Sequence, residues 1–321
     1  MSRILMPKRL TKQQVEEFYT CGFLTALDVF SASECDAVRA RSERFEQTNP
    51  ADVEWAFDIK ANLLFDWVYE LGIHPVLLDI VEDLVGPDVL LTNSIFRIKE
   101  PGSATHYGWH QDAARIQVDP PFVIAYLAIG ETTAENGCLR VIPNTHYEVQ
   151  PYRFVTYSRR RLARVKEVDE SSAVDLVLAK GQMGVFHGNT IHGSGPNTSR
   201  TRRFALINDY TPTRARQSTG QGSGQLVRGE DRWGHFAREP VPVGSFTEAN
   251  ILARRKTLCR YPENVLMGPL EPGEEISFAD QPGAAPLGSS PYFSPRGEII
   301  AQRFEFTRHF LIERNTSCIS E

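Results

Sequence analysis

The spacing of apolar residues changes once along this chain, close to residue 86. Before that point, apolar positions recur at helical spacing behind clear helix-start signals. Thr11 and Ser31 each stand three residues before a Gln or Glu, the capping-box pattern of a helix N-terminus. Pro75 suits the first turn of a further helix, which Gly86 ends. The pattern predicts three helices, over residues 11–19, 31–46 and 75–84.

From Val89 onward, the apolar residues fall in short runs separated by Gly, Pro and Asn turns. Six of these runs predict strands, over residues 89–98, 122–129, 138–142, 174–178, 184–187 and 204–210. Because no helical segments alternate with them, the pattern favours an antiparallel sandwich or barrel over a parallel α/β sheet. Helices followed by such a core predict an α+β, mainly β fold with a jelly-roll (cupin-like) centre.

The last third of the chain has a different composition. Residues 211–295 are rich in Gly, Pro, Ser and charge, which predicts long loops, and segment 217–229 is a candidate to fold over a site mouth. Residues 296–314 are compatible with a closing helix. No repeat or linker divides the chain, so we expect one domain over 1–321. Its predicted parts are a helical N-terminal part (1–86), a jelly-roll core (87–212) and a loop-rich lid with a C-terminal helix (213–321).

Composition excludes several classes of protein. The 321 residues carry a formal charge of −5, which argues against a nucleic-acid binder. No apolar stretch is long enough to span a bilayer, and the first residues lack the apolar run of a signal peptide. The five cysteines are scattered without a CxxC pair, which favours a reduced, cytoplasmic setting. The oligomeric state cannot be read from the sequence.

Three residues have the spacing of a metal site. His110 and Asp112 are two residues apart, so on a strand their side chains would point to the same face. His192 follows about eighty residues later, and Gly193 and Gly195 beside it leave room for close approach. Two His and one carboxylate form the facial triad of non-haem Fe(II) sites, which leaves adjacent positions open for a chelating keto-acid and dioxygen.

An isolated His-x-Asp is a common pattern, so the metal assignment depends on the third ligand. The other histidines are weaker candidates for that position. His187 competes for the third ligand position, but we expect it to pack beside the site or to cap its strand. His106 and His146 are interpreted as turn or surface residues. The remaining histidines have no neighbours that indicate ligation; these are His74, His235 and His309.

A keto-acid would also need a partner for its far carboxylate. A buried anion is best held by a bidentate cation, and Arg suits this role better than Lys. Arg203 opens the predicted strand 204–210, so its side chain can be held rigidly inside a barrel. Arg200 and Arg202 are expected on a solvated turn.

Several ordered motifs resemble the phytanoyl-CoA dioxygenase family of Fe(II)- and 2-oxoglutarate-dependent oxygenases, over roughly residues 12–212. They are Trp-His-Gln-Asp at 109–112, Glu-Asn-Gly-Cys-Leu-Arg-Val-Ile-Pro at 135–143, Phe-His-Gly-Asn at 186–189 and His-Gly-Ser-Gly-Pro-Asn at 192–197. Matched blocks in the same order are far more specific than any one of them.

The resemblance implies a double-stranded β-helix core, with Fe(II) and 2-oxoglutarate as cofactors and dioxygen as co-substrate. It places the metal ligands at His110, Asp112 and His192. It assigns the 2-oxoglutarate arginine to Arg203 and a further cofactor position to Ser194. An aromatic position lining the cofactor falls on Tyr126, where a relative has Trp.

The resemblance further implies hydroxylation, desaturation or cyclisation of a small-molecule or carrier- or CoA-tethered substrate, in specialised metabolism. Halogenating relatives replace the carboxylate ligand by a small residue so that chloride can bind iron, and Asp112 therefore disfavours a halogenase. A non-catalytic cupin-like binding protein is the alternative outside catalysis, and it would not need the triad and Arg203 together. The basic run 158–166 is interpreted as a solvated loop or helix face rather than as a phosphopantetheine contact.

Overall fold

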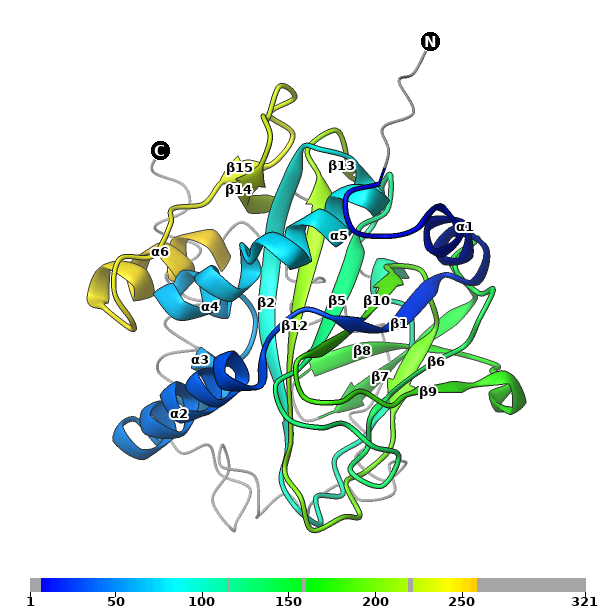
Figure 1. The fold of residues 1–321 in the computed structure, drawn as a ribbon, viewed down its shortest axis with the longest axis horizontal. Helices are drawn as coiled ribbons and strands as arrows, with labels where there is room; N and C mark the ends of the chain where they lie inside the picture. Colours follow the sequence, from blue (N-terminus) through cyan, green and yellow to red (C-terminus); the bar gives the residue numbers. More distant parts are fainter. Residues whose placement is uncertain (1–6, 115, 158–159, 219–221, 259–321) are drawn as a thin grey trace, which may run out of the picture.

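Two β-sheets pack face to face in the centre of the protein (Figure 1). The structure is a computed structural model that describes residues 7–114, 116–157, 160–218 and 222–258. Within these residues the larger sheet has the order β1-β10-β5-β12-β2-β14-β15 and the smaller sheet the order β3-β11-β6-β9. All neighbouring strands are antiparallel except β14 and β15. The predicted α+β, mainly β fold with a double-stranded β-helix core is confirmed.

Most strands of the two sheets are short, but β2 has 11 residues and β12 has 10. The larger sheet consists of β1 (Phe23–Asp28), β10 (Gln182–His187), β5 (Val123–Ala128), β12 (Arg203–Pro212), β2 (Val89–Lys99), β14 (Ser223–Arg228) and β15 (Ala237–Arg238). The smaller sheet consists of β3 (Tyr107–His110), β11 (His192–Ser194), β6 (Leu139–Val141) and β9 (Val174–Leu176). Two further sheets have two strands each. One pairs β4 (Val118–Asp119) with β13 (Arg216–Gln217), and the other pairs β7 (Tyr152–Tyr157) with β8 (Arg160–Val165).

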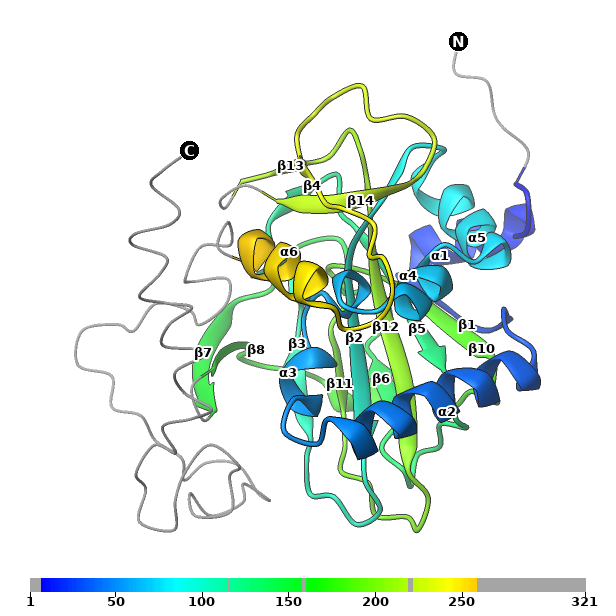
Figure 2. The ribbon, with the colours of Figure 1, turned by 90° about the vertical axis from the view of Figure 1, so that its left-hand side faces the viewer.

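Helices cover the outer face of the larger sheet (Figure 2). The α-helices are α1 (Lys12–Cys21), α2 (Ala32–Thr48), α3 (Val53–Ala56), α4 (Asp66–Gly72), α5 (Pro75–Val85) and α6 (Glu248–Leu258). Three short 3-10 helices are η1 (Ala61–Leu63), η2 (Asp112–Ala114) and η3 (Glu170–Ser172). The two predicted capping boxes are present, because Thr11 and Ser31 each accept a hydrogen bond from the backbone three residues later. None of the helices in the described segments is both long and apolar enough to cross a membrane.

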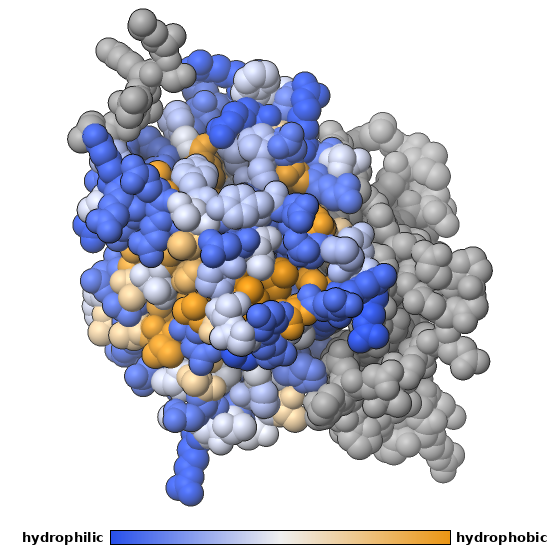
Figure 3. Space-filling model, turned by 90° about the vertical axis from the view of Figure 1, so that its right-hand side faces the viewer, coloured by the Kyte–Doolittle hydropathy of each residue, from blue (hydrophilic) through white to orange (hydrophobic). Residues whose placement is uncertain are grey.

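Strand β12 separates two apolar cores. Its residues Phe204 and Leu206 belong to the core beneath the helices, whereas Ala205 and Ile207 face the core between the two sheets. This division follows from the period of two in a strand, where successive side chains point to opposite faces. On the outer surface, the face in Figure 3 shows apolar patches scattered within a mostly polar surface, as is usual for a folded protein.

Several elements differ from the sequence-based predictions. Segment 211–295 was predicted to have little regular structure, but β14 pairs with β2 and helix α6 follows it. The basic run is neither a loop nor a helix face from Arg160 onward, because six residue pairs join β8 to β7. Tertiary pairing overrides the low strand propensity of charged residues there. The predicted closing helix 296–314 lies outside the described residues.

The division of β12 makes a stability prediction. Leu206 is completely buried, so Leu206→Ala should lower the free energy of unfolding by about 2–5 kcal/mol through lost burial and a residual cavity. Leu252→Ala in helix α6 is the matched control; that side chain is half exposed, and the loss should stay within about 0.5 kcal/mol. Urea denaturation followed by circular dichroism measures both. Equal losses would contradict the buried position of Leu206.

Candidate metal centre

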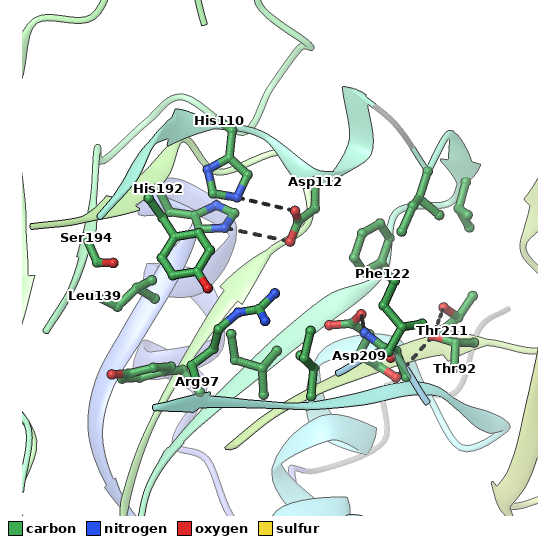
Figure 4. A pocket seen from close by; sticks show the side chains of 18 of the residues that line it. Thr92, Arg97, His110, Asp112, Phe122, Leu139, His192, Ser194, Asp209 and Thr211 are labelled. Carbon is green, nitrogen blue, oxygen red and sulfur yellow. Dashed lines mark hydrogen bonds and ion pairs between the residues drawn. The ribbon is translucent and has the colours of Figure 1, made fainter. Parts of the chain in front are cut away.

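Three side chains converge between the two sheets (Figure 4). His110 ends β3, Asp112 begins η2 and His192 begins β11, and their ligand atoms all lie within 4.8 Å of one another. The Nε2 atom of His110 is 3.5 Å from Oδ1 of Asp112, and Nε2 of His192 is 3.7 Å from Oδ2. The two histidines are direct partners in the β3–β11 pairing. The three predicted ligands are therefore brought together.

Backbone carbonyls orient both imidazole rings. His110 Nδ1 lies 2.8 Å from the carbonyl oxygen of Gly108, and His192 Nδ1 lies 3.0 Å from that of Thr190. A carbonyl oxygen only accepts, so each Nδ1 carries the proton and each Nε2 keeps a lone pair directed at the centre. Burial, and then the adjacent His192, lower the pKa of His110 to about 3, which keeps its imidazole neutral. Two imidazoles that can ligate through Nε2, together with a carboxylate, are the donor set of a facial iron site.

His110 and Asp112 were predicted to lie on one strand, and this backbone geometry was wrong. Their side chains nevertheless converge, as predicted. Strand β3 ends at His110, and Asp112 lies in a 3-10 turn instead of continuing the pleat. Gln111 between them is buried, and its Nε2 donates hydrogen bonds to the carbonyls of Glu148 and Asn189. These long-range bonds fix the turn that brings Asp112 back beside His110.

His187 is not one of the converging ligands, and its ring lies against those of Phe18 and His146. Its Nδ1 accepts a hydrogen bond from the backbone N–H of Asn189 at 3.1 Å, and burial lowers its pKa to about 4. His187 ends β10, so this contact agrees with the expectation that it caps its strand. His146 lies in a turn, as expected, but it is buried and its Nε2 donates to the carbonyl of Tyr19. The surface interpretation of His146 was therefore wrong.

A cavity extends from the three ligands between the sheets and encloses about 1270 Å³, open solvent at its mouth included. The three residues predicted to contact 2-oxoglutarate all line it: Tyr126, Ser194 and Arg203. Gln217 and Ser223 also line it, so described residues of the segment that was expected over the site mouth contribute to its wall.

Arg203 has the surroundings of an anion-binding group. Its side chain is buried at the start of β12 and donates a hydrogen bond to the carbonyl of Gly137, while Nε has no hydrogen-bond partner among the described residues. A buried guanidinium needs an anion, and the far carboxylate of 2-oxoglutarate fits this requirement. The neighbouring Arg202 turns away and pairs with Glu46 and Glu100 instead, and Arg200 is exposed. Arg202 thus has ion-pair partners that were not predicted.

The sequence analysis missed other polar side chains that line the cavity, namely Asn93, Arg97 and Asp209. Asp209 is buried and accepts a hydrogen bond from Asn93 Nδ2 at 3.0 Å. Burial, and then the charge of Asp112, raise the pKa of Asp209 to about 7. Figure 4 shows Arg97 pointing toward the space between Asp112 and Asp209. Asp209 could have been predicted from the sequence, because an even number of positions separates it from Arg203 and both residues therefore lie on one face of β12.

The family model for phytanoyl-CoA dioxygenase (PhyH) matches residues 18–205, which is more than half of the chain and includes all three converging ligands. The chain belongs to the phytanoyl-CoA dioxygenase family. The resemblance inferred from the motifs is therefore confirmed. The membership and the converging His-Asp-His set support the predicted enzyme class, an oxidoreductase of the 2-oxoglutarate-dependent non-haem iron dioxygenases, and its cofactors Fe(II) and 2-oxoglutarate.

Individual members of the phytanoyl-CoA dioxygenase family are moderately similar to this chain. The phytanoyl-CoA dioxygenase domain-containing protein 1 homolog of Dictyostelium discoideum is 29% identical over 58% of this chain and 60% of its own length. The probable alpha-ketoglutarate-dependent hypophosphite dioxygenase of Stutzerimonas stutzeri is 28% identical over 50% and 59%, respectively. The chain thus spans about three fifths of these relatives. The solved apo structure of the non-heme monooxygenase ThoJ has a TM-score of 0.71 at 28% identity, covering 78% of this chain and 96% of ThoJ.

Metal binding distinguishes the two candidate histidines in this PhyH-family chain. Loss of a residue that only hydrogen-bonds to a metal ligand weakens metal binding roughly 10- to 100-fold. We expect His192→Ala, which removes a ligand itself, to weaken Ni(II) or Fe(II) binding by more than this. His187→Ala is the matched control and should keep wild-type affinity. Anaerobic calorimetric titration with each metal measures both values. The reverse order of affinities would identify His187 as the ligand and reject the assignment.

Proposed function

We propose that this chain is an active Fe(II)- and 2-oxoglutarate-dependent oxygenase that hydroxylates a small molecule, either free or tethered to a carrier or CoA. The main support is one arrangement of side chains. The imidazoles of His110 and His192 and the Asp112 carboxylate converge in the cavity that Arg203 also lines. Arg203 is a buried cation without an acidic partner among the described residues. A protein that only binds ligands would not need these groups together.

In this proposal each side chain has a separate task. His110, Asp112 and His192 hold iron, while Arg203 and Ser194 hold the far carboxylate of 2-oxoglutarate. Tyr126 lies across from Ile207 in the β5–β12 pairing and forms part of the wall around the cofactor. The bound cofactors supply the oxidising chemistry, in which 2-oxoglutarate is converted to succinate and carbon dioxide.

The apolar part of the cavity limits the access of water. Ile116, Val118 and Phe122 line it, and the backbone N–H of Ile116 donates a hydrogen bond to the carbonyl of Asp112. Side chains of this kind keep water away from reactive intermediates and position the carbon that is oxidised. Hydroxylation, desaturation and ring closure start from the same cofactors, so the position of the substrate decides between them. Asp112 occupies the place that chloride needs in a halogenase, so we do not propose halogenation.

The end of the cavity around Asp209 supports a polar substrate. The Oδ1 atom of Asp209 is buried and has no hydrogen-bond partner among the described residues, and Thr92 and Thr211 line the cavity next to it. A buried oxygen without a partner favours a ligand that brings a donor. We therefore propose a substrate with a hydroxyl or amino group at this end. In a substrate complex, a donor atom should lie within about 3.2 Å of Oδ1, and a purely apolar contact there would refute this assignment.

We also propose a cytoplasmic setting for the enzyme. The cysteines at positions 21, 35 and 138 are free thiols in the described part of the chain, which is compatible with a reducing compartment.

Succinate formation tests the proposed function without knowledge of the substrate. Purified protein with Fe(II), 2-oxoglutarate and dioxygen should form succinate slowly, and Asp112→Ala should abolish this by removing a ligand. Arg203→Ala should raise the KM for 2-oxoglutarate by about 10- to 100-fold, the usual effect of losing a charged hydrogen bond.

Arg202→Ala provides the matched control, because Arg202 is the adjacent guanidinium and pairs with acids away from the cavity. Its succinate formation should equal that of the wild type. The proposed function is wrong if the wild-type protein forms no succinate, or if Asp112→Ala forms it at an unchanged rate.

A further inference from the structure

Lys99 is a second buried cation beside Arg203. It is the last residue of β2, it is almost fully buried, and it is the direct cross-strand partner of Arg203 on β12. Its Nζ donates a hydrogen bond to Oγ of Ser194 at 2.8 Å and another to the carbonyl of Gly195. The described partners of both cations are thus neutral oxygens. Neither cation forms an ion pair with an acid of the described residues.

Two adjacent buried cations without an anion are unfavourable, because their charges repel and both have lost their hydration. An arginine stays protonated under these conditions, whereas a lysine gives up its proton readily. Burial, and then the charge of Arg203, lower the pKa of Lys99 to about 7. The free protein therefore relieves the repulsion by holding Lys99 partly neutral at neutral pH.

The other groups that face Lys99 do not replace the missing anion. The Tyr107 ring of β3 lies 5.7 Å from Nζ, and Ser194 of β11 is uncharged. Cys138, just before β6, is the remaining titratable group near Lys99; burial raises the pKa of its thiol to about 11, so it is neutral. Arg203 of β12 is the one permanent charge among these neighbours.

We propose that Lys99 is a second cationic contact for the far carboxylate of 2-oxoglutarate, and that it takes up a proton from solvent when the cofactor binds. This inference rests on the proposed function. Because Ser194 Oγ already accepts from Lys99, the Ser194 hydroxyl proton is left to point at the same carboxylate. Lys99, Arg203 and Ser194 together surround one anionic group with three donors. The binding of 2-oxoglutarate is then coupled to pH.

Proton uptake by the wild-type protein tests the inference without any substitution. The protein is loaded with Ni(II), which prevents turnover, and is titrated calorimetrically with 2-oxoglutarate in two buffers of different ionisation enthalpy. Lys99 should take up close to one proton well above pH 7 and far less below it, since its pKa of about 7 in the free protein rises when the anion binds. The affinity for 2-oxoglutarate should fall by up to about tenfold per pH unit above pH 7.

Lys99→Met removes the charge while keeping a side chain of similar length. We expect it to bind 2-oxoglutarate about 10- to 100-fold more weakly at pH 6, and to lose the proton uptake at pH 8. Lys180→Met is the matched control, because Lys180 lies on the surface and pairs with Asp36. Its affinity and its proton uptake should both equal those of the wild type. Protons released by metal-bound water are common to all three proteins and cancel in the comparison.

The outcomes separate the inference from the proposed function. If the wild-type protein binds 2-oxoglutarate but takes up no proton at pH 8, Lys99 has only a structural role and the inference is overturned. The same holds if Lys99→Met keeps both the affinity and the pH dependence of the wild type. If the wild-type protein binds no 2-oxoglutarate at all, the proposed function itself fails.

Discussion

The antiparallel pairing of β2 with β12 determines where the chemistry of this protein lies. One face of the paired strands is covered by helices, and the buried Phe204 and Leu206 belong to that core. The opposite face carries Arg203 and Asp209 into the cavity. A slip of one residue would exchange the two faces, so the packing of apolar side chains under the helices also fixes the charged groups between the sheets.

The metal ligands depend on a second close pairing, between β3 and β11. His110 and His192 are direct partners there, and the register shifts between His192 and Ser194. Gly193 lies within this shift, and a Cβ atom at that position would be only 2.8 Å from the carbonyl oxygen of Tyr107. A larger residue would push the strands apart. The glycine beside the distal histidine therefore has a steric reason, in agreement with its interpretation from the sequence.

The sequence predicted the parts of the fold and site that depend on local patterns. Capping boxes located two helices, short apolar runs between turn residues located six strands, and ordered motifs located the ligands. The sequence did not predict features that depend on contacts between residues far apart in the chain. The turn at Asp112 depends on hydrogen bonds from Gln111 to residues up to 78 positions away. Lys99 was missed because the strand that pairs with Arg203 cannot be identified from either strand alone.

The charge of the paired residues also changes along the cavity face of β2 and β12, from cationic at one end to acidic at the other. Lys99 pairs with Arg203, Arg97 with Ala205, Ile95 with Ile207, and Asn93 with Asp209. A carboxylate gains attraction at the first pair and from Arg97 at the second, whereas it meets a like charge at the last once Asp209 is ionised. The apolar pair in between offers a carboxylate no partner. The cations of the first two pairs therefore favour anionic groups toward the Lys99 end, which leaves the Asp209 end open to a ligand of different charge.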